Sequence, residues 1–429
     1  MQKRELAPQP FSTGLTYQIE LPSLPRRMNV PDPNLPIKRG EIAILLSTRG
    51  RPEKLLQVFN SLKTSTVGRD KISLWLYVDD DDAVTRQAID GGTFPEVGFP
   101  VHWNIGPRTP EWGQTFHVLW QATGRTAEVY MMANDDVRFE TVGWDNVLRE
   151  HFARYPDGIV LACPYDPVAP EIATFPIIGG KWLNIMGFIY AGYFHYWFDD
   201  MWVDQVGRMI GRYINIPILL SPIKGKGKTQ RMRCLPFWTR FFQLTLRERK
   251  EAAAKLINAM YPTDEKNRSE ALAKMEETAA DFEKNTPSFS DLYHVFQEER
   301  HTAMSPEDRD RFFPLYFKQE AHAVSRLLSF AQEHYDKKEY AEALKYIEAT
   351  QMADIRVRQA HEMRIQCLRA LGRNSEADQA EREAILAWPK MNTARRTFRF
   401  LGKMANEGKT LLINLTSGGK RDPNRKLGG

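Results

Sequence analysis

Ala127 to Glu140 reads AEVYMMANDDVRFE, an apolar run that ends abruptly in polar residues. Val129 to Met132 has the length and composition of a buried strand. Asn134, Asp135 and Asp136 follow it. Ligands of open α/β sheets bind at the carboxyl ends of strands, and adjacent carboxylates there suit Mg²⁺ or Mn²⁺ carrying a phosphate-bearing molecule. A strand followed by an ordinary Asx turn explains the same residues. The choice between a metal site and a structural turn therefore depends on the neighbouring segments.

The segment from Glu41 to Pro52 has the same layout, an apolar run followed by a polar turn. Glu41 to Leu46 (EIAILL) predicts a buried strand, and the residues from Leu55 to Leu62 predict a helix after the turn. The turn places Arg49 and Arg51 at the start of that helix, where backbone N–H groups are also available. This combination is typical of an anion site, although two solvated arginines explain the residues equally well.

Acidic residues also follow the next segment that is predicted to be a strand. Ile72 to Val78 (ISLWLYV) is apolar and runs into four consecutive acids, Asp79 to Asp82. Four adjacent carboxylates repel one another, which an exposed turn tolerates in water. A solvated turn is therefore one interpretation. The other is that one or two of these acids accept hydrogen bonds from a base or a ribose.

Strands and helices alternate through residue 140, and further elements are expected beyond it. A short strand is expected at 100–104, a helix at 113–122, another helix at 144–152 and a strand at 159–163. This alternation predicts a parallel, three-layered α/β domain whose functional edge lies at the carboxyl ends of its strands. We expect polar residues from three separate strands to meet at that edge.

An aromatic tract, Gly187 to Val203 (GFIYAGYFHYWFDDMWV), contains Asp199 and Asp200. Aromatic residues are more often core than a ligand-binding platform. A carboxylate directly after such a run can lie in a partly desolvated pocket, where it gains the basicity needed to accept a proton. The residues themselves leave a structural and a catalytic role equally open.

The segment from Gln205 to Arg247 contains no acidic residue but many lysines and arginines. Within it, Ile223 to Arg233 (IKGKGKTQRMR) has the glycines of a loop. In one interpretation this loop closes over a diphosphate, in a second it follows a polyphosphate backbone, and in a third it is merely solvated.

The composition is that of a soluble globular protein, with 42% hydrophobic and 26% charged residues. The net charge of +5 favours anionic partners but is too small to imply nucleic acid by itself. Three widely separated cysteines predict neither a disulfide framework nor a zinc site, and fit a reducing, cytoplasmic setting. We expect no signal peptide and no membrane span.

Five segments are expected along the chain. Residues 1–39 are proline-rich and predict an extended arm, residues 40–243 the α/β domain, and residues 244–320 a helical connector. Residues 321–404 contain a short internal repeat with an offset of about 34 residues, which predicts two helical hairpins. The basic tail, residues 405–429, is expected to be disordered. The repeat helices are expected at 321–335, 340–352, 356–371 and 375–387.

Several short motifs occur in a characteristic order. They are S-T-R-G-R-P at 47–52, V-D-D at 78–80, N-x-G at 104–106, A-x-G at 122–124, N-D-D at 134–136, F-D-D at 198–200 and Q-R-M-R-C at 230–234. In this order the chain resembles a GT-A glycosyltransferase of the large inverting family related to chitin and cellulose synthases. Asn134 stands where that family's D-x-D motif has its first acid, Asp199 where it has a glutamate, and Cys234 where it has a tryptophan. The repeats resemble tetratricopeptide hairpins.

The resemblance implies a GT-A fold and a nucleotide-sugar donor, a UDP-sugar first of all. It implies that Asp136, helped by Asp135, holds Mn²⁺ or Mg²⁺ on the donor diphosphate. Asp200, with Asp199 beside it, would be the general base that deprotonates an acceptor hydroxyl. The residues implied to bind the nucleotide sugar are Ser47, Thr48, Arg49, Arg51, Asp79, Asp80, Asn104, Asn134, Asp135, Arg231 and Arg233.

Three functions are compatible with this sequence. The first is transfer of a sugar from a nucleotide sugar to a hydroxyl group. The second keeps the enzyme and makes modified bases of DNA or RNA the acceptor, because the acid-free segment and the basic tail would bind a polyphosphate. The third is a non-catalytic, transferase-like domain whose helical repeats bind a protein partner.

Overall fold

The described residues form two compact units. One comprises residues 27–231 and 245–287, and the other residues 1–26, 232–244 and 288–429. We call the first the sheet unit and the second the helical unit. The computed structural model describes residues 18–20, 31–108, 112–167, 172–194, 198–224, 235–285, 306–353, 355, 357–387 and 412–414.

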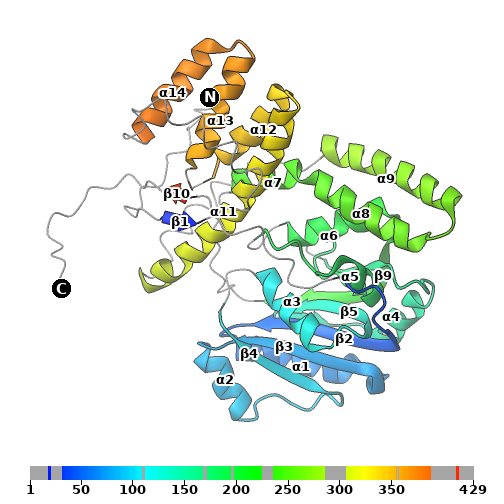
Figure 1. The fold of residues 1–429 in the computed structure, drawn as a ribbon. Helices are drawn as coiled ribbons and strands as arrows, with labels where there is room; N and C mark the ends of the chain where they lie inside the picture. The colour runs from blue at the N-terminus through cyan, green and yellow to red at the C-terminus, as the bar shows by residue number, and fades with distance from the viewer. Residues whose placement is uncertain are drawn as a thin grey trace, which may run out of the picture. The chain divides into compact units, whose positions relative to one another are not determined.

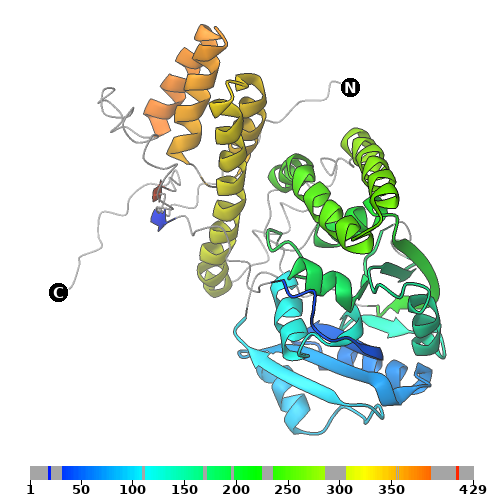
Figure 2. The same ribbon diagram turned by 45° about the vertical axis from the view of Figure 1, so that its right-hand side comes forward.

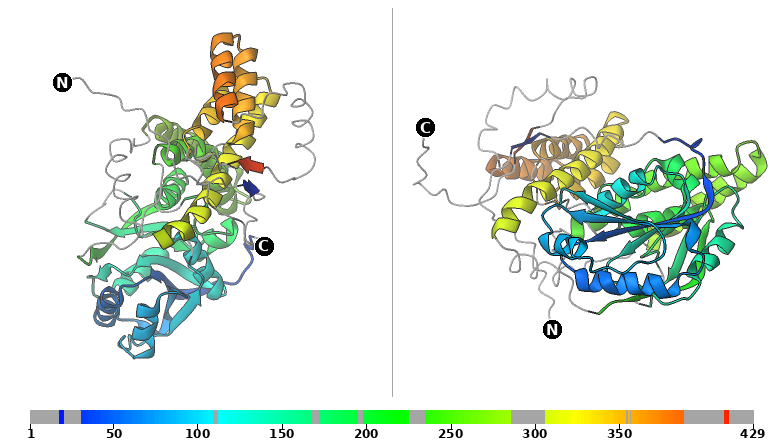
Figure 3. Two further views of the ribbon diagram at one scale, coloured as in Figure 1. Left: turned by 90° about the vertical axis from the view of Figure 1, so that its left-hand side faces the viewer. Right: turned by 90° about the horizontal axis from the view of Figure 1, so that it is seen from below.

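An eight-stranded sheet, in the order β4-β3-β2-β5-β8-β7-β9-β6, forms the centre of the sheet unit (Figures 1 and 3). β2, β3, β4 and β5 are parallel to one another. β8 is antiparallel to both β5 and β7, so β5 and β7 point the same way, and β9 is parallel to β7. β6 pairs antiparallel with β9. The strands are β2 (Lys38–Thr48), β3 (Ile72–Asp79), β4 (Val101–Gly106), β5 (Ala127–Asn134), β6 (Val137–Phe139), β7 (Leu161–Tyr165), β8 (Ile177–Gly179) and β9 (Tyr213–Pro222).

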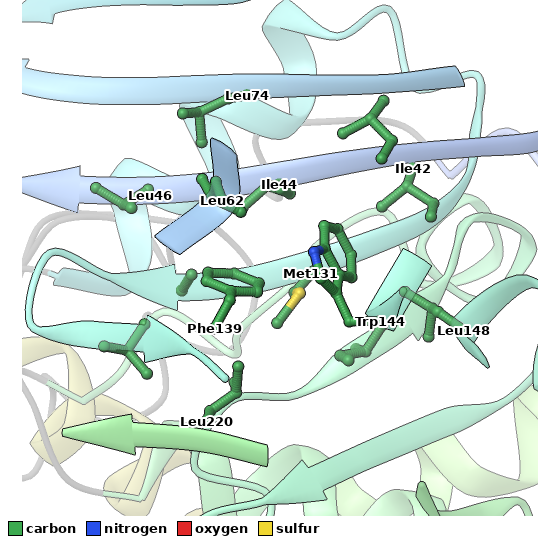
Figure 4. Close-up of a cluster of buried hydrophobic side chains, with 14 of the residues drawn as sticks. Ile42, Ile44, Leu46, Leu62, Leu74, Met131, Phe139, Trp144, Leu148 and Leu220 are labelled. Atoms are coloured by element: carbon green, nitrogen blue, oxygen red, sulfur yellow. The ribbon is translucent and has the colours of Figure 1, made fainter. Parts of the chain in front are cut away.

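Helices cover both faces of this sheet. Apolar residues at every second position of the parallel strands pack against α1 (Pro52–Ser65) and α4 (Trp144–Phe152) on one face. Figure 4 shows part of this core, with Leu62 of α1 and Trp144 of α4 facing side chains from several strands. On the other face, α3 (Trp112–Ala122) contacts β2 and β3, and α5 (Gly180–Met186) contacts β5. The result is the three-layered, mostly parallel α/β architecture that the sequence predicts.

Five further helical segments are described in the sheet unit. The short helix η1 (Arg69–Lys71) precedes β3, and α2 (Ala83–Asp90) follows it. α6 (Asp199–Met209) packs against both α8 (Leu246–Met260) and α9 (Glu265–Asn285), and α8 also contacts α5. Lys250 of α8 forms an ion pair with Glu276 of α9 at 2.6 Å. These two helices therefore extend the packing around α6.

The helical unit consists of α7 (Leu235–Leu244), α11 (Pro306–Asp336), α12 (Tyr340–Thr350), α13 (Arg358–Ala370) and α14 (Asn374–Ala387). Neighbouring helices from α11 to α14 pack against one another (Figure 2), and α7 contacts α11 and α12. The four predicted repeat helices are therefore present, and the all-helical class of this region is confirmed. Their assignment to tetratricopeptide repeats stays a prediction.

Most of the two terminal segments lies outside the described residues. Within them, β1 (Gln18–Glu20) pairs antiparallel with β10 (Leu412–Asn414). The predicted extended arm and disordered tail otherwise stay predictions. Among the helices that the structure describes, none has the length and apolar composition to cross a membrane.

Candidate functional site

The carboxyl ends of three neighbouring strands bring the predicted site residues to one edge of the sheet. In the pairing of β2 with β5, Ser47 lies opposite Asn134, and in the pairing of β2 with β3, Thr48 lies opposite Val78. The residues that follow these strands therefore emerge side by side. Two groups of charged side chains meet there.

The first group is centred on Arg51. Its guanidinium forms a two-pronged ion pair with Asp135, and its Nη1 also donates to Oδ2 of Asp136 at 3.1 Å. Thr48 donates its hydroxyl to Oδ2 of Asp135 at 2.8 Å. Asp135 is fully buried. Burial raises the pKa of Asp135 to about 6 while Arg51 and Thr48 oppose the rise, so the carboxylate is charged at neutral pH.

Asp136 is the more accessible acid of this pair, with 35% of its side chain exposed. Nζ of Lys54 lies 3.9 Å from its Oδ2 and donates to the backbone carbonyl of Ile223 at 3.3 Å. The backbone N–H of Ile223 in turn donates to the carbonyl of Asp136 at 2.6 Å. The chain after β9 therefore leaves the sheet beside Asp136, and the predicted basic loop begins at this point.

Lys54 is a site residue that the sequence did not reveal. It occupies the first turn of α1, three residues after Arg51. Two cations at the positive end of a helix dipole oppose the dipole, unless carboxylates or a bound anion neutralise them. A basic residue in the first turn was the available signal, and Glu53 in the same turn obscures it.

The second group is centred on Arg49. It pairs with Asp79 at 3.0 Å and with both carboxylate oxygens of Asp81, and Arg108 lies 4.0 Å from Asp81. Burial raises the pKa of Asp79 although Arg49 lowers it. Asp80 is exposed beside this group. Three acids of the predicted run therefore lie at the edge, and two of them share one guanidinium.

Asp82, the last acid of that run, stabilises the local fold. Asp82 caps α2, because its carboxylate accepts from the backbone N–H of Thr85 at 3.1 Å. It also accepts from the backbone N–H of Gly50 at 2.6 Å. Gly50 has φ of 62°, a conformation that favours glycine. Asp82 thus fixes the turn that carries Arg49 and Arg51.

Two asparagines that were predicted as site residues lie on strands beside these groups. Asn104 lies on β4 opposite Tyr77, and its Nδ2 donates to the carbonyl of Leu76 at 3.4 Å. Asn134 is the last residue of β5 and is half-buried, as is Ser47. Their predicted contacts with a nucleotide sugar stay predictions.

Asp199 and Asp200 lie in the first turn of α6, after Phe198 with φ of 77°. The Oδ1 of Asp200 accepts from the N–H of Met201 at 2.8 Å, and burial raises the pKa of Asp200 to about 6. A Cβ added to Gly113 would lie 2.9 Å from Oδ2 of Asp199. Since α3 begins after the carboxyl end of β4, its close approach to Asp199 brings the start of α6 to the same side of the sheet.

Asp204, which follows in the same helix, stabilises the fold. It pairs with Arg208 at 2.6 Å and accepts from the N–H of Ala173 at 3.2 Å. Arg208 stacks over the ring of Tyr213 at 4.0 Å. These contacts join α6 to the start of β9 and to the segment before β8.

The carboxylates do not fit a resident divalent cation in this arrangement. Asp135 is buried and both its oxygens already accept hydrogen bonds, so only Asp136 offers an accessible oxygen. Arg51 and Lys54 already place two positive charges beside it. No group of three or more His, Cys, Asp or Glu side chains suited to a metal occurs among the described residues.

Some predicted residues cannot be placed. Arg231 and Arg233, together with most of the basic loop from 223 to 233, lie outside the described residues. Their predicted contacts with a donor diphosphate, and the alternative contacts with nucleic acid, stay predictions.

Comparison with known proteins gives distant structural likenesses only. No protein-family model matches the chain, and neither does any curated protein sequence. The fold is similar to that of the mannosyltransferase PcManGT from Pyrobaculum calidifontis, solved with GDP-Man and Mn²⁺. The two are 11% identical, with 70% of this chain and 90% of that chain covered and a TM-score of 0.38. Residues 1–349 of S. aureus TarS, solved with UDP, are 11% identical, with 80% and 91% covered and a TM-score of 0.40. The same part of TarS with UDP-GlcNAc gives 9% identity, 67% and 91% coverage and a TM-score of 0.37.

Proposed function

We propose that the sheet unit is a glycosyltransferase that transfers a sugar from a nucleotide sugar to a hydroxyl group. The observation that carries this proposal is the pair of cation–carboxylate groups at adjacent strand ends, Arg49 with Asp79 and Arg51 with Asp135. Such an edge offers acceptors for a base or ribose beside cations for a diphosphate. A nucleotide sugar carries both parts on one molecule.

The half of the site that faces the acceptor contains Asp200. In the proposed reaction the acceptor oxygen attacks the anomeric carbon while the Asp200 carboxylate takes the hydroxyl proton. The bond between that carbon and the diphosphate oxygen breaks, and the nucleoside diphosphate leaves with the electron pair. A carboxylate with a pKa of about 6 is a stronger base than an ordinary aspartate and is still deprotonated at neutral pH.

A binding experiment tests the donor site. We expect a UDP-sugar or GDP-sugar to raise the melting temperature of the full chain, because a ligand at roughly 100 times its Kd stabilises the folded state by about 2.7 kcal/mol. Arg49→Ala should weaken this binding at least tenfold, since it removes the partner of Asp79. The matched control is Arg39→Ala, which removes an ion pair with Glu128 at the opposite ends of β2 and β5.

A transfer assay tests the acceptor side. Asp200→Asn should keep nucleotide-sugar binding and lose donor turnover, measured as release of the nucleoside diphosphate. If no nucleotide sugar binds the unmodified protein, the transferase proposal is wrong and a non-catalytic role for the domain replaces it. If Asp200→Asn turns over normally, the base lies elsewhere.

A further inference from the structure

We propose that Arg51 and Lys54, and no divalent cation, supply the positive charge that stabilises the departing diphosphate. This inference rests on the proposed transferase function. It reverses the cofactor expected from the sequence, which placed Mn²⁺ or Mg²⁺ on Asp136. The role of Asp135 and Asp136 changes with it, from holding a metal to holding a guanidinium.

The hydrogen bonds of Arg51 leave part of its guanidinium available. A guanidinium has five N–H donors, and three are engaged, two by Asp135 and one by Asp136. Among the described residues no other acceptor is bonded to Arg51, and 13% of its side chain is exposed. Two donors therefore remain, one on each terminal nitrogen, and a phosphate can accept both in a fork.

Asp135 fixes the direction of that fork. It is fully buried, its two oxygens accept from Nε and Nη2 of Arg51, and Thr48 holds the same carboxylate from the other side. A guanidinium locked in this way needs no rearrangement when negative charge develops on the leaving group. Asp135 and Thr48 are then positioning residues, and Arg51 is the group that would touch the diphosphate.

Lys54 adds a second charge beside Asp136, with 8% of its side chain exposed. Its ammonium lies 3.9 Å from Asp136 and is anchored to the carbonyl of Ile223. Arg51 and Lys54 thus balance the charge of Asp135 and Asp136. Against this balance, a divalent cation at the remaining oxygen of Asp136 would add net positive charge beside Arg51 and Lys54, whereas a diphosphate can accept the two remaining N–H donors of Arg51.

The test uses the unmodified full chain first. Donor binding and nucleoside diphosphate release are measured after removal of divalent cations with a chelator, and again with Mn²⁺ or Mg²⁺ in excess. The inference expects rates within about twofold of each other in the two conditions. Turnover that disappears with the chelator and returns with Mn²⁺ overturns it while leaving the transferase function intact. Failure of any nucleotide sugar to bind in either condition overturns the function itself.

Variants identify the residues that supply the charge. Arg51→Lys keeps one charge but loses the fork, and we expect it to lower turnover on the order of 100-fold, the usual cost of removing one such donor. Asp135→Asn should lower turnover through misplacement of Arg51, and Arg51→Lys should not be rescued by Mn²⁺. Arg39→Ala, at the opposite edge of the sheet, should leave turnover unchanged. Normal turnover of Arg51→Lys would contradict the proposal, provided that circular dichroism confirms its fold.

Discussion

Asp200 occupies a position that costs the protein stability. It begins α6 directly after Phe198, whose φ of 77° is rare for a residue with a side chain. Burial raises its pKa to about 6, so at neutral pH the folded protein carries a charge that water would solvate better. Such costs concentrate at functional sites, where a reactive group is held in place by the rest of the fold.

Replacement of this one carboxylate should therefore stabilise the protein. The folded-state pKa of Asp200 lies above the unfolded value of about 3.9, so stability falls as the pH rises from about 4 to about 6. We expect Asp200→Asn to raise the free energy of unfolding near neutral pH by up to about 3 kcal/mol, and to change it little near pH 4. Urea denaturation at the two pH values measures both. The control, Asp70→Asn, replaces an exposed acid and should have no such effect. An equal gain at both pH values would show that the charge is not the cause.

A substitution of Thr48 tests how much its hydrogen bond stabilises the buried ion pair between Arg51 and Asp135. Its hydroxyl is buried and donates to Asp135, so Thr48→Val keeps the shape and removes one hydrogen bond to a charged group. We expect a loss of about 1.5–3 kcal/mol in the free energy of unfolding, measured by urea denaturation. Thr64→Val is the comparison, because that hydroxyl bonds only carbonyls of its own helix and the residue is exposed. Equal effects of the two substitutions would contradict this role of Thr48.

At the scale of elements, local pattern predicts the strands and helices well. β2, β3 and β5 follow apolar runs, and α1 follows the spacing of its leucines. The eight-residue α2 was missed because the acid run ahead of it suggested an exposed turn. β8 was missed because three residues carry too little periodicity.

Parallel pairing also explains how far the site could be predicted. Since β2, β3 and β5 are parallel, the residues after each had to meet at one edge. The pairing of particular charges could not be foreseen, because Arg51 and Asp135 are 84 residues apart and the rotamer of Arg51 depends on packing. Our proposal that Arg51 and Lys54 act in place of the expected metal rests on that pairing.

Two adjacent glycines lie where the short strand β8 ends and α5 begins. A Cβ on Gly179 would lie 2.1 Å from the carbonyl oxygen of Gly158, and a Cβ on Gly180 would lie 2.1 Å from that of Ala127. Both neighbours are backbone atoms, so they cannot rotate away. β8 joins β5 to β7, and thereby joins the predicted donor edge to the strand that packs near α6.

We therefore expect Gly179→Ala to destabilise the sheet unit by about 1–3 kcal/mol or more, measured by urea denaturation. φ of Gly179 is −66°, so the loss would come from steric overlap and not from backbone conformation. Gly91→Ala is the control, because its φ is −78° and the nearest atom to its Cβ would lie 3.1 Å away. A Gly179→Ala variant as stable as the unmodified protein would mean that β8 can shift without cost.

The chain passes between the two units more than once. It leaves the sheet unit at residue 231, contributes α7 to the helical unit, and returns at residue 245 for α8 and α9. In the sequence, a piece of the helical unit therefore lies between two parts of the sheet unit. A discontinuous arrangement of this kind predicts that no single cut in the chain separates the two units, because a piece of one stays attached to the other.

Truncation after residue 287 tests this directly. It deletes α11 and α12, which contact α7, and leaves α7 attached to the sheet unit. Phe237, Trp238, Phe241 and Phe242 of α7 are buried in the full chain, and we expect those that pack against α11 and α12 to face water after truncation. A contiguous aromatic surface of this size favours association, so we expect the truncated chain to bind anilinonaphthalene sulfonate and to form oligomers in light scattering. Deletion of residues 405–429, which leaves α7 and its partner helices in place, should produce neither effect. A truncated chain that stays monomeric and binds no dye would mean that α7 buries its aromatic face without the C-terminal helices.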